Sequence, residues 1–161
     1  MVVKKGGNKI DWKVLIACIV ILGFVGLTGS LFTQQSVGSE WYDSIKPSIT
    51  PPDWVFPVVW NVLFFLIAVS LYFAFQASKS VEKKKMTALV YGINFYLNLI
   101  WSMLFFGFRN PLAAFYQIGL LWISIAFMII YTWKIDRKAS LLLVPYFLWV
   151  SFACYLNYLM I

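Results

Sequence analysis

The sequence predicts an all-α integral membrane protein, a bundle of five membrane-spanning helices forming one domain over residues 1–161. Hydrophobic residues make up 62% of the chain and charged residues only 12%, and the mean hydropathy is +0.82. A soluble domain surrounds its core with charged side chains, whereas a membrane protein presents apolar side chains to lipid on every side. Five apolar runs also approach or exceed the roughly 20 residues that a helix needs to cross a bilayer.

The five predicted spans cover residues 14–33, 54–77, 86–106, 111–133 and 139–161. Short polar segments join them. The runs are too long for the strands of a membrane barrel, and they lack the strict alternation that such strands show. The spans take up most of the chain, so the sequence offers no separate soluble catalytic domain.

The basic residues predict how the chain is oriented. If the amino terminus lies inside, the inner segments hold eleven of the 13 basic residues, namely Lys4, Lys5, Lys9, Lys13, Lys79, Lys83, Lys84, Lys85, Lys134, Arg137 and Lys138. Only Lys46 and Arg109 then lie outside. This asymmetry predicts the amino terminus inside and the carboxyl terminus outside. Topology and attraction to the lipid bilayer explain the net charge of +7, so no nucleic-acid partner is expected.

Several kinds of chemistry are excluded by residues that the sequence lacks. It contains no histidine, which excludes imidazole-ligated zinc or haem iron and any Ser-His or Cys-His nucleophile pair. No Asp or Glu lies within a predicted span, so a carboxylate proton relay has no candidates. Cys18 and Cys154 lie within spans and do not indicate a redox compartment. We therefore expect no metal site and no obligatory cofactor.

The segment KPSITPPDWVFPVVW, residues 46–60, contains four of the six prolines and precedes the second span. Proline fixes its own φ angle, so this end of the first loop is expected to be rigid. Thr50, followed by Pro51 and Asp53, is expected to be the N-cap of the second span. Trp41 and Tyr42 carry large apolar rings, which favours a loop folded back onto the bundle.

Small residues in the first span predict close helix packing. Gly26 and Ser30 have the small-xxx-small spacing that lets a second helix approach. Packing within one chain is favoured over a seam between two copies, because the motif alone does not say which helix approaches.

Two stripes of polar and aromatic residues predict side chains that face the bundle interior. The first occupies one face of the third span and consists of Tyr91, Asn94, Asn98 and Trp101. The second, at strict i, i+4 spacing in the fifth span, consists of Pro145, Trp149, Ala153 and Asn157. The two Asn residues should face inward because an unpaired amide is costly in hydrocarbon. Hydrogen bonding for stability and lining of a pocket are equally favoured for this pair.

The helical rise places Trp60, Trp101 and Trp149 in the outer half of the bilayer, beneath the proline-rich loop. The runs that carry a family resemblance are WYDSIKPSITPPDWVFPVVWNVLF, LNLIWSMLFFGFRNP and LLLVPYFLWVSFACYLNYL. Through them the chain resembles the tryptophan-rich sensory protein family, also called the translocator protein or TspO/MBR family. The resemblance extends over nearly the whole chain from about residue 14.

The resemblance implies a five-helix bundle, often a homodimer in bacteria, with a ligand cavity that opens under the first loop. It implies porphyrins such as protoporphyrin IX and haem as ligands, and a prokaryotic plasma or inner membrane as the location. The positions that match ligand-binding residues of the family are Tyr42, Pro51, Trp60, Asn98, Trp101, Trp149 and Ala153. Trp60 and Trp149 match the tryptophans tied to porphyrin breakdown, and would be catalytic only if such degradation occurs here.

Two departures from the family pattern matter. Ile49 stands where the family usually has Trp, and no basic residue follows Tyr155 or Tyr158, so cholesterol recognition and steroid transport are unsupported. We expect a receptor or sensor for a flat apolar ligand, with Lys46 or Arg109 at the rim facing ligand carboxylates. An enzyme is not favoured, although light-dependent porphyrin degradation stays open. The alternatives are a transporter of small solutes or lipid, and a structural membrane scaffold.

Overall fold

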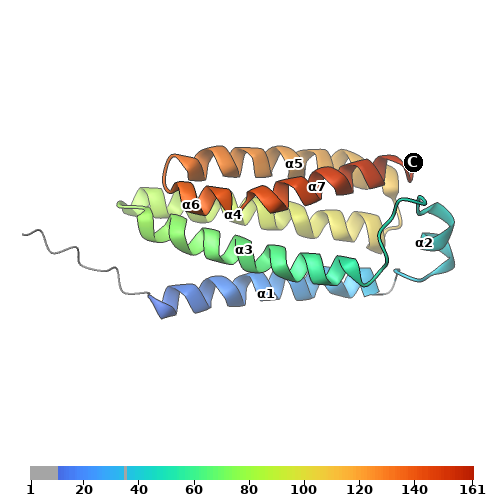
Figure 1. Ribbon diagram of the computed structural model, residues 1–161, viewed down its shortest axis with the longest axis horizontal. Coiled ribbons are helices and arrows are strands. Elements are labelled where there is room, and N and C mark those ends of the chain that lie inside the picture. Colours follow the sequence, from blue (N-terminus) through green and yellow to red (C-terminus); the bar gives the residue numbers. More distant parts are fainter. Residues whose placement is uncertain (1–10, 35) are drawn as a thin grey trace, which may run out of the picture.

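The computed structural model describes residues 11–34 and 36–161, apart from the side chains of residues 21, 25, 32 and 34. Its elements are α1 (Trp12–Gln34), α2 (Glu40–Ile45), α3 (Val55–Ala77), α4 (Val81–Ser102), the π-helical turn η1 (Met103–Gly107), α5 (Pro111–Trp133), α6 (Arg137–Leu141) and α7 (Val144–Tyr158) (Figure 1). The described residues contain helices and turns and no strands.

Five stretches are long and apolar enough to cross a membrane, which confirms the five-span prediction. They are Trp12–Leu31, Val55–Ala77, Val81–Gly107, Pro111–Trp133 and Arg137–Tyr158. The third begins earlier than the predicted residue 86, because the three lysines at 83–85 already belong to the first turns of α4. Ser80 caps this helix by accepting a hydrogen bond from the backbone N–H of Lys83 at 3.2 Å.

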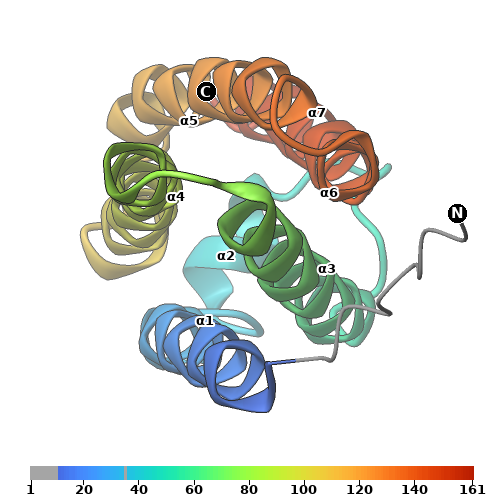
Figure 2. The ribbon, with the colours of Figure 1, turned by 90° about the vertical axis from the view of Figure 1, so that its left-hand side faces the viewer.

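Seen along the bundle, the helices form a ring in the order α1, α3, α6 with α7, α5 and α4 (Figure 2). Helix α5 packs along both α4 and α7, and α1 closes the ring between α3 and α4. Helix α3 packs well against α6 but only sparsely against α7. The ring is therefore least tightly closed between α3 and α7. The short helix α2 lies across the end of the bundle where the chain finishes (Figure 1).

One face of α4 forms side-chain hydrogen bonds to α3 and α5. Tyr91 shares hydrogen bonds with Ser70 of α3 at 2.7 Å and with Thr132 of α5 at 3.3 Å. One turn further along α4, the side-chain N–H₂ of Asn94 donates to the hydroxyl of Ser124 on α5 at 2.8 Å. The predicted inward face of the third span is thus confirmed. Residues on the opposite face of α4, including Leu89, Ile93 and Tyr96, are exposed.

Helix α1 approaches α3 at Gly26, where a Cβ atom would lie 3.1 Å from two ring carbons of Phe64. The glycine thus makes room for a phenyl ring of the same chain, which confirms that it packs within the chain. Gly23, three residues earlier, has nothing within 4 Å of the equivalent point.

One local prediction was wrong. Thr50 is not a helix N-cap, because its N–H closes a turn on the carbonyl of Pro47 at 3.0 Å and α3 begins only at Val55. The fifth span is confirmed, and the structure adds a break within it, since α6 ends at Leu141 and α7 begins at Val144. Pro145 explains the break, because it has no N–H to donate to the carbonyl four residues earlier.

Candidate functional site

The first loop is held against the end of the bundle by aromatic packing. Tyr42 of α2 is only 3% exposed and packs with Phe105 and Ala114, and its ring centroid lies 6.1 Å from that of Phe106. The Ser36 hydroxyl adds a hydrogen bond to the carbonyl of Phe106 at 2.9 Å. Both phenylalanines belong to η1, and a π-helical turn of this kind often marks a functional region.

Both predicted rim cations already have partners. The Lys46 ammonium lies 2.6 Å from a carboxylate oxygen of Asp43, and this hydrogen bond raises the pKa of Lys46 above its usual value. Arg109 has a positive φ of 48°, and its guanidinium lies 5.7 Å from the centre of the Trp41 ring. The Lys46 ammonium has further N–H donors and its side chain is 36% exposed, so a ligand carboxylate can share it with Asp43.

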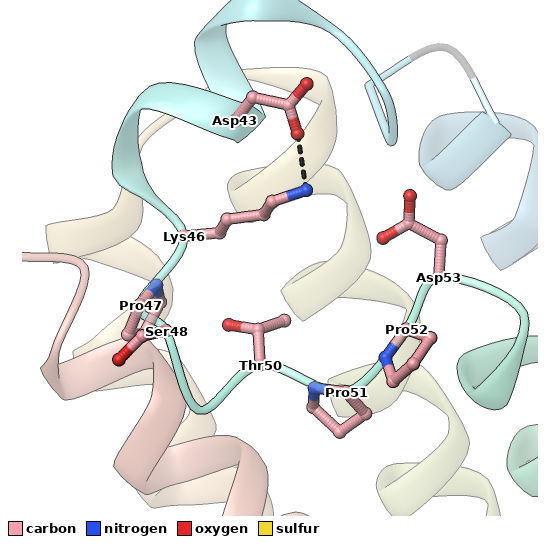
Figure 3. Close-up of a pocket in the computed structure, with 8 residues that line it drawn as sticks. All are labelled: Asp43, Lys46, Pro47, Ser48, Thr50, Pro51, Pro52 and Asp53. Atoms are coloured by element: carbon pink, nitrogen blue, oxygen red, sulfur yellow. Dashed lines mark ion pairs between the residues drawn. The ribbon is translucent and has the colours of Figure 1, made fainter.

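A polar pocket of about 370 Å³ lies in the proline-rich part of the loop (Figure 3). It is lined by Asp43, Lys46, Pro47, Ser48, Thr50, Pro51, Pro52 and Asp53. Two carboxylates face one ammonium here, so this pocket is unsuited to an apolar ring. The predicted ligand residue Pro51 lies here and does not line the apolar groove described next.

An apolar groove of about 570 Å³ runs between α3 and α7, where the ring of helices is least closed. It is lined by Val58, Val59, Val62, Leu63, Pro145, Leu148, Trp149 and Phe152. The Trp149 ring is wedged by Phe56 at 5.9 Å and Phe152 at 5.8 Å between centroids. Val62 and Leu148 are 54% and 63% exposed, so the groove opens sideways toward the bilayer.

Trp60 does not line this groove but packs against the interior. Its ring lies 5.5 Å from that of Phe64 and 6.2 Å, edge-on, from that of Tyr146. The buried hydroxyl of Tyr146 accepts a hydrogen bond from the side-chain N–H₂ of Asn98 at 3.0 Å and donates one to Asn94 at 3.2 Å. Tyr146 therefore links Asn98 to Trp60.

Trp101 forms the next contact toward the loop. Its indole N–H donates to Asn157 at 3.2 Å, and its ring stacks on Phe105 at 5.2 Å. Ala153 packs against the main hydrophobic cluster, which also contacts Trp60, Trp101 and Trp149. The predicted residues thus share one end of the bundle but fall into three places: the groove with Trp149, the interior, and the loop with Tyr42 and Pro51.

Sequence reasoning did not identify Tyr146 or Phe56 as parts of this region. Tyr146 lies three residues before Trp149, on the helix face next to the predicted stripe, so its helical position could have indicated it. Phe56 lies within the proline-rich segment 46–60, in the first turn of α3, and packs against Trp149.

This arrangement defines a multi-pass α-helical membrane protein with an apolar groove near a tightly anchored loop. The chain belongs to the TspO/MBR family, whose sequence pattern matches residues 16–161, so the resemblance noted in the sequence is confirmed. It is 40% identical over 144 residues to the Tryptophan-rich protein TspO of Chlorobaculum tepidum, covering 89% of this chain and 91% of that protein.

Two further relatives carry other names. The Tryptophan-rich sensory protein of Cereibacter sphaeroides is 29% identical over 149 residues, which are 92% of this chain and 89% of the relative. The sheep Translocator protein is 33% identical over 137 residues, 82% of this chain and 80% of the relative. Together with the five spanning helices, the prokaryotic relatives identify a multi-pass integral protein of a prokaryotic membrane.

Proposed function

We propose that this protein is a membrane receptor or sensor that binds a flat apolar ligand of the porphyrin type, such as protoporphyrin IX or haem, in the groove between α3 and α7. The observation that carries the proposal is the groove itself, an apolar recess of about 570 Å³ with an indole in its wall. That volume falls within the roughly 300–1,000 Å³ typical of small-molecule sites.

The side chains of the groove suit a large conjugated ring. Trp149 offers an aromatic surface held in place by Phe56 and Phe152, and the remaining lining residues are apolar. Ligand carboxylates would point toward the loop, where the partly exposed Lys46 ammonium is shared with Asp43. The printed name of the Cereibacter sphaeroides relative, a sensory protein, fits a receptor that reports on a bound ligand.

A titration of protoporphyrin IX into the purified protein tests the proposal, with tryptophan emission as the readout. Trp149→Phe should remove most of the ligand-dependent quenching and weaken binding. Trp60→Phe should have a smaller effect, because that ring faces Tyr146 and not the groove. Trp133→Phe is the control, because Trp133 is the last residue of α5 and does not line the groove. This variant should bind as the wild type does. Equal binding by the Trp149 and Trp133 variants would refute the groove as the site.

A further inference from the structure

The cations of the described chain gather at the end of the bundle opposite the first loop. This end holds the start of α1, the turn between α3 and α4, and the turn between α5 and α6, on the left in Figure 1. Its eight basic residues are Lys13, Lys79, Lys83, Lys84, Lys85, Lys134, Arg137 and Lys138. Only three carboxylates, those of Asp11, Glu82 and Asp136, lie there, which leaves an excess of five positive charges.

Within the part of the chain that the structure describes, the carboxylates at this end form no ion pair with the cations there. An oxygen of Asp11 accepts hydrogen bonds from the backbone N–H groups of Lys13 and Val14 at 3.2 and 3.3 Å. An oxygen of Asp136 accepts from the backbone N–H of Ala139 at 2.8 Å and caps α6. Among the described residues, the one ion pair lies at the other end of the molecule, between Lys46 and Asp43.

Aromatic rings lie beside two of these cations. The Lys84 ammonium lies 5.2 Å from the centre of the Phe75 ring, and the Arg137 guanidinium lies 5.3 Å from that of Trp133. Trp12 and Trp133 are 61% and 45% exposed at the same end, and exposed tryptophans favour the headgroup region of a bilayer. We therefore expect these cations to lie at the level of the lipid phosphates.

The opposite end has the reverse balance. There Lys46 and Arg109 face the carboxylates of Glu40, Asp43 and Asp53, a deficit of one positive charge. The net charges of the two ends thus differ in both magnitude and sign. Attraction to anionic lipid is therefore expected at the basic end and not over the whole molecule.

We propose that the basic end is a binding surface for the headgroups of anionic phospholipids. The ligand class is a lipid phosphate diester with a net negative charge, as in phosphatidylglycerol. Each cation contributes through charge attraction at the membrane surface, so binding falls with every basic residue removed and with added salt.

Lipid exchange into nanodiscs containing the full chain tests this inference. The discs are made from phosphatidylcholine mixed with phosphatidylglycerol, and the enrichment of phosphatidylglycerol around the protein is measured. Both ends of the chain contact lipid in a nanodisc, so the result does not depend on orientation. We expect enrichment for the wild type that high salt abolishes. The triple variant Lys83→Gln, Lys84→Gln, Lys85→Gln should lose most of this enrichment. Each charge removed should lower the affinity for phosphatidylglycerol roughly fivefold.

Three comparisons keep the test decisive. The matched triple variant Lys83→Arg, Lys84→Arg, Lys85→Arg keeps the charge and should enrich phosphatidylglycerol as the wild type does. Glu82→Gln raises the charge excess and should increase the enrichment. Lys46→Gln, at the far end, should leave it unchanged. Equal enrichment in the wild type and the triple Gln variant, a loss with Lys46→Gln, or full competition by inorganic phosphate would each overturn the proposal.

Discussion

Tyr146 contacts Asn94, Asn98 and Trp60. Asn98 and Asn94 bond its hydroxyl from α4, and the ring carries Trp60 on its edge. Their spacing in the sequence correctly placed both Asn residues on the inner face of their helix. The sequence favoured hydrogen bonding and pocket lining equally for this pair, and the structure shows hydrogen bonding for both residues.

Removing this hydroxyl should destabilise the bundle. Tyr146→Phe leaves the Asn98 N–H₂ and the Asn94 carbonyl without their buried partner, which costs about 1 kcal/mol. Tyr158→Phe on the same helix, where the tyrosine is 59% exposed, is the matched control and should cost little. Unfolding in detergent measures both. A Tyr146→Phe protein as stable as the control would show that the hydrogen bonds contribute nothing.

The contact between Gly26 and Phe64 should not tolerate a side chain. Phe64 cannot move aside freely because its other neighbour is the Trp60 ring at 5.5 Å. Gly26→Val is therefore expected to lower the free energy of unfolding by about 2 kcal/mol through overpacking. Gly23→Val, with nothing within 4 Å, carries the same change in helix propensity without the clash. A similar loss in both variants would mean that propensity, and not the contact, is responsible.

At the scale of elements, the sequence predicted which segments are helices better than how they begin and end. Apolar length alone identifies the spans, since hydrocarbon requires it. It does not reveal the π-helical turn after Ser102, which depends on how Phe105 and Phe106 pack against α2. The cap pattern at Thr50 does not reveal that the chain turns there before α3 begins.

The anchoring of α2 should be lost at high pH. Burial raises the pKa of Tyr42 from 10.0 to about 12, and the nearby carboxylates of Asp53 and Asp43 add to the shift. The neutral hydroxyl is favoured in the folded state, so its contribution to stability is complete below pH 10 and disappears as pH rises toward 12. Tyrosinate absorbance and Trp41 emission should report this release together. Tyr42→Phe keeps the ring packing and should reduce the transition, and an unchanged transition in that variant would assign it to another group.

At the scale of the whole molecule, helical rise could place Trp60 and Trp149 at similar depth but not on the same cavity wall. Depth along a helix follows from residue number, whereas its rotation about its own axis follows from packing. Here Phe64 packs against Gly26 and against Trp60, and the Trp60 ring faces Tyr146. The looseness between α3 and α7 likewise depends on contacts between distant segments, which no local pattern encodes.

A substitution that fills the groove should separate ligand binding from stability. Val62 lines the groove from α3 and is 54% exposed, so Val62→Trp should occupy the space for a ligand ring without disturbing the core. Steric exclusion worth about 1.4 kcal/mol would weaken protoporphyrin IX binding roughly tenfold, while the unfolding midpoint stays near that of the wild type. Val20→Trp, at a 63% exposed position on α1 away from the groove, adds the same bulk and should bind normally. If both variants keep wild-type affinity, the ligand does not sit between α3 and α7.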